Sequence, residues 1–238
     1  HIEIMNYYLL LLLPFVGAFN FRKLFATSLL ATGLAFNPIQ IANANPSMIP
    51  SIHNQGEFMK TSVVTERNNI YLYGAISPES CEQLKNKLNN MDYNGRLYKI
   101  SYNSDPPPIN LHIQSGGGSL LNALYIVDLI ETLDTPVNTY IDGYSASAAS
   151  LIGVVGDKRY MTKNSMIMIH QLSSGKEGKY QELDDDQQNM QQFMNKIKAV
   201  YLRKTTIPYI QLSEILNHDL WLDATTCKKL GLVDEIIE

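Results

Sequence analysis

Short runs of apolar residues, separated by segments with helical spacing, fill the chain from about residue 63 to its end. Apolar or alternating runs predict strands at residues 63–67, 69–73, 109–115, 136–141, 159–162, 166–170 and 232–237. Apolar positions three and four residues apart predict helices at residues 78–88, 120–133, 146–155, 180–204, 210–216 and 224–229. Because strands and helices alternate, the sequence predicts an α/β fold with a mostly parallel sheet.

Turn-forming residues mark where some of these elements begin and end. Ser77 before Pro78 is typical of a helix start, with serine at the N-cap and proline at the first helical position. Three consecutive prolines at residues 106–108 cannot lie inside a helix or a central strand. We therefore expect residues 92–108 to form a surface loop.

The first 44 residues contain two apolar runs, at residues 6–19 and 24–36, and end in an A-x-A cleavage pattern, Ala42-Asn43-Ala44. This resembles the bipartite presequences of proteins imported into secondary plastids. The sequence thus predicts a cleaved presequence at residues 1–44, a linker at residues 45–62 and one domain at residues 63–238. We expect an organelle, a plastid, as the final location. The alternative is a retained membrane anchor or a cytoplasmic protein.

The composition of the chain excludes several classes of function. With 238 residues and 45% hydrophobic residues, the chain can bury a sizeable core. A net charge of −4 and the absence of a basic run argue against a nucleic-acid partner. The two cysteines, Cys81 and Cys227, form no CxxC pair, so no disulfide framework or zinc site is predicted.

The small-residue stretch at residues 140–150, YIDGYSASAAS, is the main candidate for chemistry. A serine at a helix N-terminus lies where free backbone N–H groups favour a developing oxyanion. Ser147 and Ser145 are both candidate nucleophiles, and His170 at the end of a predicted strand is a candidate base. The glycine-rich SGGGS at residues 115–119 lacks both GxGxxG and GK[ST], so it does not indicate nucleotide binding.

Four segments resemble the marker segments of the ClpP family, the proteolytic subunits of the Clp protease, in the family's order and at nearly its spacing. They are IQSGGGS, GYSASAAS, KNSMIMIHQ and DLWLDATTCKKLGLVDEII. The resemblance implies a ClpP/crotonase-like fold of repeated ββα units with a long handle helix at residues 180–204. It also implies a serine endopeptidase of two stacked seven-membered rings, made of this or paralogous subunits, which degrades unfolded polypeptides supplied by an ATP-driven AAA+ unfoldase.

The resemblance also implies roles for individual residues and no cofactor or metal. The implied triad is Ser147 as nucleophile, His170 as general base and Asp219 as the group that orients the histidine. The backbone N–H groups of Gly118 and Ala148 would form the oxyanion hole. Gly116 and Gly117, at the end of the preceding strand, would pair with the substrate backbone.

The sequence departs from the family pattern at three places. Gly116 stands where the family usually has proline, Ala148 replaces the usual methionine, and residues 105–108 look like an insertion. Three alternatives remain: a catalytically silent ring subunit, a crotonase-like acyl-CoA enzyme, and a signal-peptide peptidase with a serine–lysine pair. Lys163 is the nearest lysine for the last of these.

Overall fold

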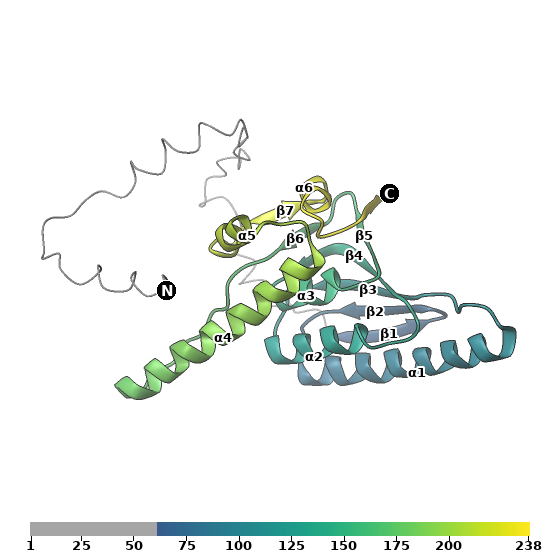
Figure 1. The fold of residues 1–238 in the computed structure, drawn as a ribbon, viewed down its shortest axis with the longest axis horizontal. Helices are drawn as coiled ribbons and strands as arrows, with labels where there is room; N and C mark the ends of the chain where they lie inside the picture. The colour runs from purple at the N-terminus through teal and green to yellow at the C-terminus, as the bar shows by residue number, and fades with distance from the viewer. Residues whose placement is uncertain (1–60) are drawn as a thin grey trace, which may run out of the picture. The chain divides into compact units, whose positions relative to one another are not determined.

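A sheet of mostly parallel strands lies at the centre of residues 61–238, the part of the chain that the computed structural model describes (Figure 1). The strands are β1 (Ser62–Glu66), β2 (Asn69–Tyr73), β3 (Ile109–Ser115), β4 (Val137–Ala146), β5 (Lys158–Thr162), β6 (Met166–Met168), β7 (Trp221–Asp223) and β8 (Glu235–Ile237). The helices are α1 (Pro78–Tyr102), α2 (Leu120–Ile130), α3 (Ala148–Val154), α4 (Tyr180–Lys204), α5 (Tyr209–Leu216) and α6 (Ala224–Lys229). The predicted presequence and nearly all of the predicted linker lie outside the described residues.

The strand order is β1-β2-β3-β4-β5-β8, while β6 pairs with the end of β4 and β7 pairs with β6. Only the pairs β1–β2 and β6–β7 are antiparallel among these neighbours. Side chains alternate along β3, so that Ile109, Leu111 and Ile113 are buried whereas His112 is only partly buried. The prediction of an α/β fold with a mostly parallel sheet is thereby confirmed.

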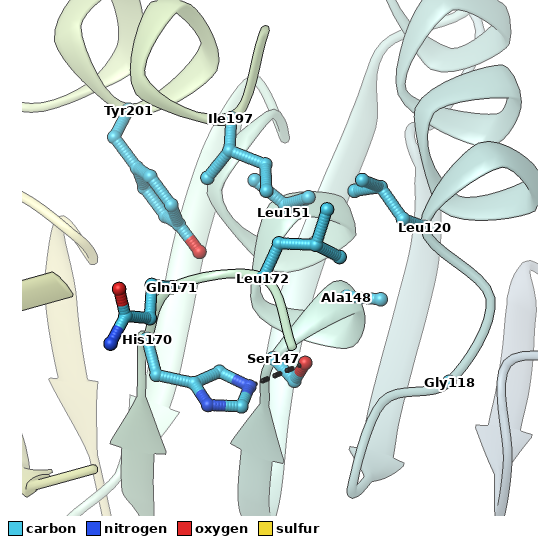
Figure 2. Close-up of a pocket in the computed structure, with 10 residues that line it drawn as sticks. All are labelled: Gly118, Leu120, Ser147, Ala148, Leu151, His170, Gln171, Leu172, Ile197 and Tyr201. Atoms are coloured by element: carbon cyan, nitrogen blue, oxygen red, sulfur yellow. Dashed lines mark hydrogen bonds between the residues drawn. The ribbon is translucent and has the colours of Figure 1, made fainter. Parts of the chain in front are cut away.

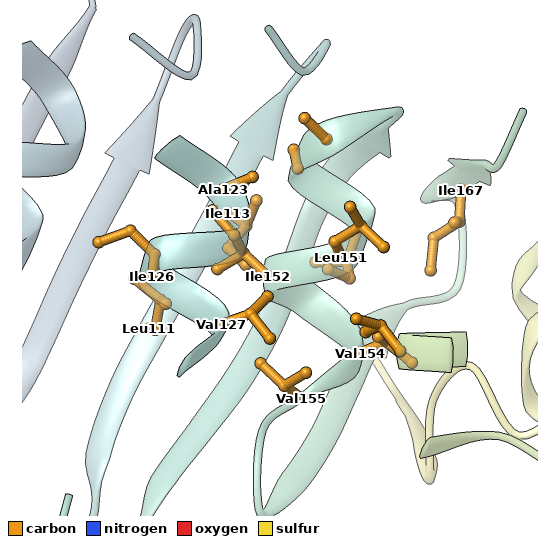
Figure 3. Close-up of a cluster of buried hydrophobic side chains, with 14 of the residues drawn as sticks. Leu111, Ile113, Ala123, Ile126, Val127, Leu151, Ile152, Val154, Val155 and Ile167 are labelled. Atoms are coloured by element: carbon orange, nitrogen blue, oxygen red, sulfur yellow. The ribbon is translucent and has the colours of Figure 1, made fainter. Parts of the chain in front are cut away.

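Helices α2 and α3 pack against the buried face of the sheet and form the core with it (Figure 3). All seven residues of α3 are buried, and this helix consists largely of small side chains at its start. A Cβ added to Gly153 would lie 3.0 Å from the Ile141 side chain, so α3 lies close against β4. The small residues of the stretch 146–153 thus serve packing, and they fix the place where α3 begins.

Helix α1 is longer than predicted. It continues to Tyr102, so the expectation that residues 92–108 form a loop is wrong for its first eleven residues. The buried Asp92 carboxylate accepts a hydrogen bond of 2.8 Å from the backbone N–H of Thr135. Gly95 is buried against the same threonine, and these tertiary contacts outweigh the weak helix propensity of Asn94 and Gly95. The helix ends at Asn103, which has a left-handed φ of 48°, just before the prolines.

Helix α4 matches its predicted bounds and projects from the rest of the domain in Figure 1. Its buried residues, Ile197, Val200 and Tyr201, all lie in its second half. Its end is held by Arg159, whose Nη1 donates to the backbone oxygens of Lys204 at 2.6 Å and of Gly231 at 2.7 Å. None of the helices in residues 61–238 combines the length and the apolar composition needed to cross a bilayer.

Candidate active site

Ser147 lies in the single-residue turn between β4 and α3, and its backbone is unusual. Its φ of 54° and ψ of −128° place it in a region that non-glycine residues rarely adopt. Its N–H donates to the carbonyl of Met168, at the end of β6, at 2.9 Å. This turn directs the Ser147 side chain out of the sheet and towards the segment that follows β6 (Figure 2).

His170 lies two residues beyond the end of β6, which is shorter than the predicted strand at residues 166–170. Its Nε2 is 2.8 Å from Ser147 Oγ, and its Nδ1 is 2.9 Å from Asp219 Oδ1. An Nδ1–H that donates to the carboxylate leaves Nε2 as the acceptor of the serine proton. The next backbone N–H, that of Gln171, donates to Leu216 O at 2.7 Å, which ties the histidine segment to the end of α5, just before Asp219.

The other candidate nucleophile and base do not reach this point. Ser145 is fully buried in β4, and its Oγ has no hydrogen-bond partner among the described residues. Lys163 follows β5, and its backbone N–H donates to Ile237 in the last strand at 3.1 Å. The group that contacts the Ser147 hydroxyl is therefore an imidazole rather than an amine. Within residues 61–238 no cluster of three or more His, Cys, Asp or Glu side chains is placed to hold a metal ion.

The remaining described histidines lie elsewhere. His112 stacks between Tyr71 and Tyr140 on the partly exposed face of the sheet, and its Nδ1 is 2.9 Å from Asp142. His218 lies beside Asp219 in sequence, but its Nε2 faces Glu214 at 3.4 Å. Among the described histidines, the one whose imidazole contacts a serine hydroxyl is His170.

The glycines after β3 differ in their surroundings, and Gly117 lies against the same turn. A Cβ added to Gly117, whose φ is 96°, would lie 2.7 Å from Ser147 Cβ and 2.8 Å from Ala146 O. A Cβ added to Gly118 would overlap the backbone oxygen of Ile76, because residues 76 and 118 form a parallel bridge. Only glycine fits these two positions. Gly116, by contrast, is exposed, and a Cβ there would meet nothing within 4 Å.

An apolar pocket opens beside Ser147 and His170 (Figure 2). Gly118 and Ala148 line it together with apolar side chains from α2, α3, α4 and the segment after His170. These side chains are Leu120, Leu151, Leu172, Ile197 and Tyr201. The pocket can therefore receive an apolar side chain next to a bond held at Ser147.

Two further residues contact the serine turn and were not singled out from the sequence. The Oγ of Ser150 donates to the backbone oxygen of Ser147 at 2.6 Å. The same Oγ is 2.7 Å from the hydroxyl of Tyr201, which reaches it from α4. The sequence carried one signal for Ser150, a hydroxyl three residues after the nucleophile in an otherwise apolar helix, but the distant Tyr201 carried none.

A serine hydroxyl, an imidazole and a carboxylate in this order and at these distances form the arrangement that serine hydrolases use. The comparisons with known proteins agree with that class. The Clp protease family model matches residues 57–238. Proteolytic subunit 1 of the ATP-dependent Clp protease of Rhodopirellula baltica is 28% identical over 82% of this chain and 82% of its own length. The proteolytic subunit of Pleurastrum terricola is 31% identical over 69% of this chain and 81% of its own.

Solved structures give the same result. A single-residue mutant of ClpP1 from Listeria monocytogenes superposes with a TM-score of 0.63 at 25% identity, covering 72% of this chain and 91% of that one. The chain belongs to the Clp protease family.

Proposed function

We propose that this protein is the proteolytic subunit of an ATP-dependent Clp protease and cleaves peptide bonds with Ser147, His170 and Asp219. The observation that supports this most directly is the pair of contacts at His170, 2.8 Å to Ser147 Oγ and 2.9 Å to Asp219 Oδ1. Family membership and the named relatives support the same activity. The reaction uses side chains and backbone amides only, without a cofactor.

In the proposed reaction, Ser147 Oγ attacks the substrate carbonyl carbon while His170 Nε2 takes the serine proton. The negative oxygen of the tetrahedral intermediate is held by the backbone N–H groups of Gly118 and Ala148. His170 then gives its proton to the leaving amine nitrogen as the C–N bond breaks and an acyl-serine forms. A water molecule releases the acyl group by the same steps, with His170 again as base. Asp219 keeps Nδ1 protonated throughout.

Substrate binding is proposed at two features beside the triad. Gly116 and Gly117 follow the last residue of β3. The N–H of Gly117 donates to Ser115 Oγ at 3.1 Å and its carbonyl accepts from Ile76 at 2.8 Å, so we assign pairing with an extended substrate to the backbone of the exposed Gly116. The apolar pocket lined by Leu120, Leu151 and Leu172 would take the side chain before the scissile bond. We therefore expect a preference for apolar residues at that position and little selectivity elsewhere.

The assembly and the location follow from the family and the N-terminal pattern. We propose two stacked seven-membered rings, of this or paralogous subunits, that receive unfolded polypeptides from a Clp-type AAA+ unfoldase. We also propose that residues 1–44 direct the chain to a plastid and are removed there. The presence of the family in the alga Pleurastrum terricola supports this location. N-terminal sequencing of the protein purified from its cells tests the cleavage.

The activity is tested by treating the full 238-residue chain with a fluorophosphonate probe. We expect mass spectrometry to find the adduct on Ser147 and expect Ser147→Ala and His170→Ala to abolish labelling. Ser145→Ala is the matched control, because it removes a buried hydroxyl two residues away that has no hydrogen-bond partner within residues 61–238. Labelling at another residue, or an assembled ring of normal size that is not labelled, would contradict the proposal. The second result would indicate a catalytically silent subunit.

A further inference from the structure

The carbonyl of Ser147 is held more firmly than the usual first carbonyl of a helix. It accepts hydrogen bonds from the backbone N–H of Ser150 at 3.1 Å and from the Oγ of Ser150 at 2.6 Å. Ser150 Oγ is also 2.7 Å from the hydroxyl of Tyr201. Ser150 is 3% exposed and Tyr201 is 2% exposed, so water does not compete for these bonds.

The donors and acceptors in these hydrogen bonds follow from the number of protons that each group carries. A carbonyl can only accept, so the single proton of Ser150 Oγ points to the oxygen of Ser147. The bond between the two hydroxyls must then use the proton of Tyr201. Burial raises the pKa of Tyr201 well above its ordinary value, so this proton stays in place at all physiological pH values. The order is therefore Tyr201 O–H to Ser150 Oγ, and Ser150 O–H to the carbonyl of Ser147.

This carbonyl belongs to the same planar peptide unit as the N–H of Ala148. Fixing the oxygen at one end fixes the direction of the N–H at the other end, and a hydrogen bond to the oxygen also polarises the N–H. In the proposed reaction, the N–H of Ala148 is one of the two oxyanion donors. A donor of this kind is effective only when it already points to the oxyanion before the reaction.

We propose that Ser150 and Tyr201 are positioning residues that orient the oxyanion-hole N–H of Ala148, and that through Tyr201 the position of α4 controls this orientation. The inference rests on the proposed function of Ser147. Ser150 and Tyr201 act through the peptide unit, because their hydroxyls bond to the carbonyl of Ser147 and to each other. Because Tyr201 belongs to the buried second half of α4, a shift of this helix would move its hydroxyl and loosen the peptide.

The test compares Tyr201→Phe, Ser150→Ala and the double variant in the full-length chain, using a fluorogenic peptide with an apolar residue before the leaving group. Removing one hydroxyl from the chain of bonds should lower kcat by about tenfold for Tyr201→Phe and more for Ser150→Ala, with KM changed less than about twofold. Because Tyr201 acts through Ser150, the double variant should match Ser150→Ala alone.

A second measurement separates positioning from general destabilisation. A peptide aldehyde forms a tetrahedral adduct with an oxyanion, whereas the matching peptide alcohol does not. The inhibition constant of the aldehyde should rise by the same factor as kcat falls, and that of the alcohol should stay constant. Thr139→Val is the control, because it removes a buried hydroxyl that donates to Gly153 in the same helix at 2.6 Å, away from the serine turn.

The outcomes are distinct. An unchanged kcat in Tyr201→Phe, additive effects in the double variant, or equal losses in Thr139→Val would each overturn the positioning role while leaving the proteolytic function intact. An inactive wild-type protein, without labelling at Ser147, would overturn the proposed function and this inference together.

Discussion

At the scale of single residues, most other contacts of the site hold Ser147 in its unusual backbone conformation. A non-glycine residue with φ of 54° and ψ of −128° costs on the order of 1–3 kcal/mol. Bonds on both sides oppose this cost: the N–H donates to Met168, and the carbonyl accepts from Ser150. The strained turn presents the hydroxyl to His170 and gives α3 its first free N–H groups at the same point.

Gly117 should tolerate substitution as poorly as any residue of the triad, because its surroundings leave no space for a side chain. In Gly117→Ala, the new Cβ would lie 2.7 Å from Ser147 Cβ and 3.1 Å from Ala148 N. We expect kcat/KM to fall by roughly a hundredfold, as for the loss of an oxyanion donor. Steady-state kinetics on a short fluorogenic peptide measure the effect.

The control for this change is Gly143→Ala. Gly143 has a similar positive φ of 86°, but a Cβ there would meet only the Gln114 side chain at an ordinary 3.7 Å. Both variants should lose about 1 kcal/mol or more of stability from backbone strain, and only Gly117→Ala should lose activity. Equal losses of activity in the two variants would show that strain in the sheet, rather than contact with Ser147, is responsible.

At the scale of elements, most of the fold follows from hydrophobic periodicity, and the exceptions have identifiable causes. The bounds of α4 were predicted correctly because its apolar residues recur at helical spacing, and the predicted bounds of α6 also match. The second half of α1 was missed because its stability comes from Thr135, which is distant in the chain. The serine-containing stretch and the histidine were found from local pattern, whereas the choice of Ser147 over Ser145 and the assignment of Asp219 came from the resemblance to the ClpP family. The 2.8 Å contact between Ser147 and His170 depends on the pairing of β4 with β6, which no local pattern reveals.

Replacing Gly95 in α1 by alanine should change the stability in the direction opposite to the usual one. Replacing glycine by alanine inside a helix usually stabilises it by about 1 kcal/mol. Here the added Cβ would overlap Thr135 Oγ1 and lie 3.2 Å from two carbons of the same side chain. Rotation of the threonine would move Oγ1 away but would leave the tight contact with Thr135 Cβ. We expect Gly95→Ala to lower the free energy of unfolding by about 1–3 kcal/mol, measured by urea denaturation.

Two companion variants check the cause. Asn94→Ala changes the exposed neighbour and should stabilise α1 by a few tenths of a kcal/mol through propensity alone. In a Thr135→Ala background Oγ1 and Cγ2 are gone and only Cβ remains, at 3.2 Å, so Gly95→Ala should lose most of its destabilising effect. If Gly95→Ala stabilises the wild-type chain, tertiary contact does not explain the extension of α1.

At the scale of the whole molecule, the first half of α4 contains no residue that is buried within the described part of the chain. The buried residues of this 25-residue helix are Ile197, Val200 and Tyr201, near its end, whereas Leu183 near its start is 42% exposed. Isolated helical turns are marginal in water, because most helical stability comes from packing of an apolar face. In the proposed pair of rings, this half of α4 would pack against the opposite ring. Since Tyr201 lies on the same helix, pairing of the rings and activity should be coupled.

Leu183→Glu tests this coupling by placing a charge on the apolar stripe that includes Met190 and Met194. Burial of an unpaired carboxylate at an interface is costly, so the double ring should separate into single rings. Peptidase activity should fall with it, by about tenfold or more, because α4 would lose the support that keeps the hydroxyl of Tyr201 on Ser150. Native mass spectrometry and peptide hydrolysis on the same samples follow both effects.

Gln192→Glu is the control, because it adds the same charge on the opposite side of α4 and should leave assembly and activity intact. A double ring that persists in Leu183→Glu would mean that α4 does not join the rings. Single rings with full activity would mean that ring pairing does not affect the active site through α4.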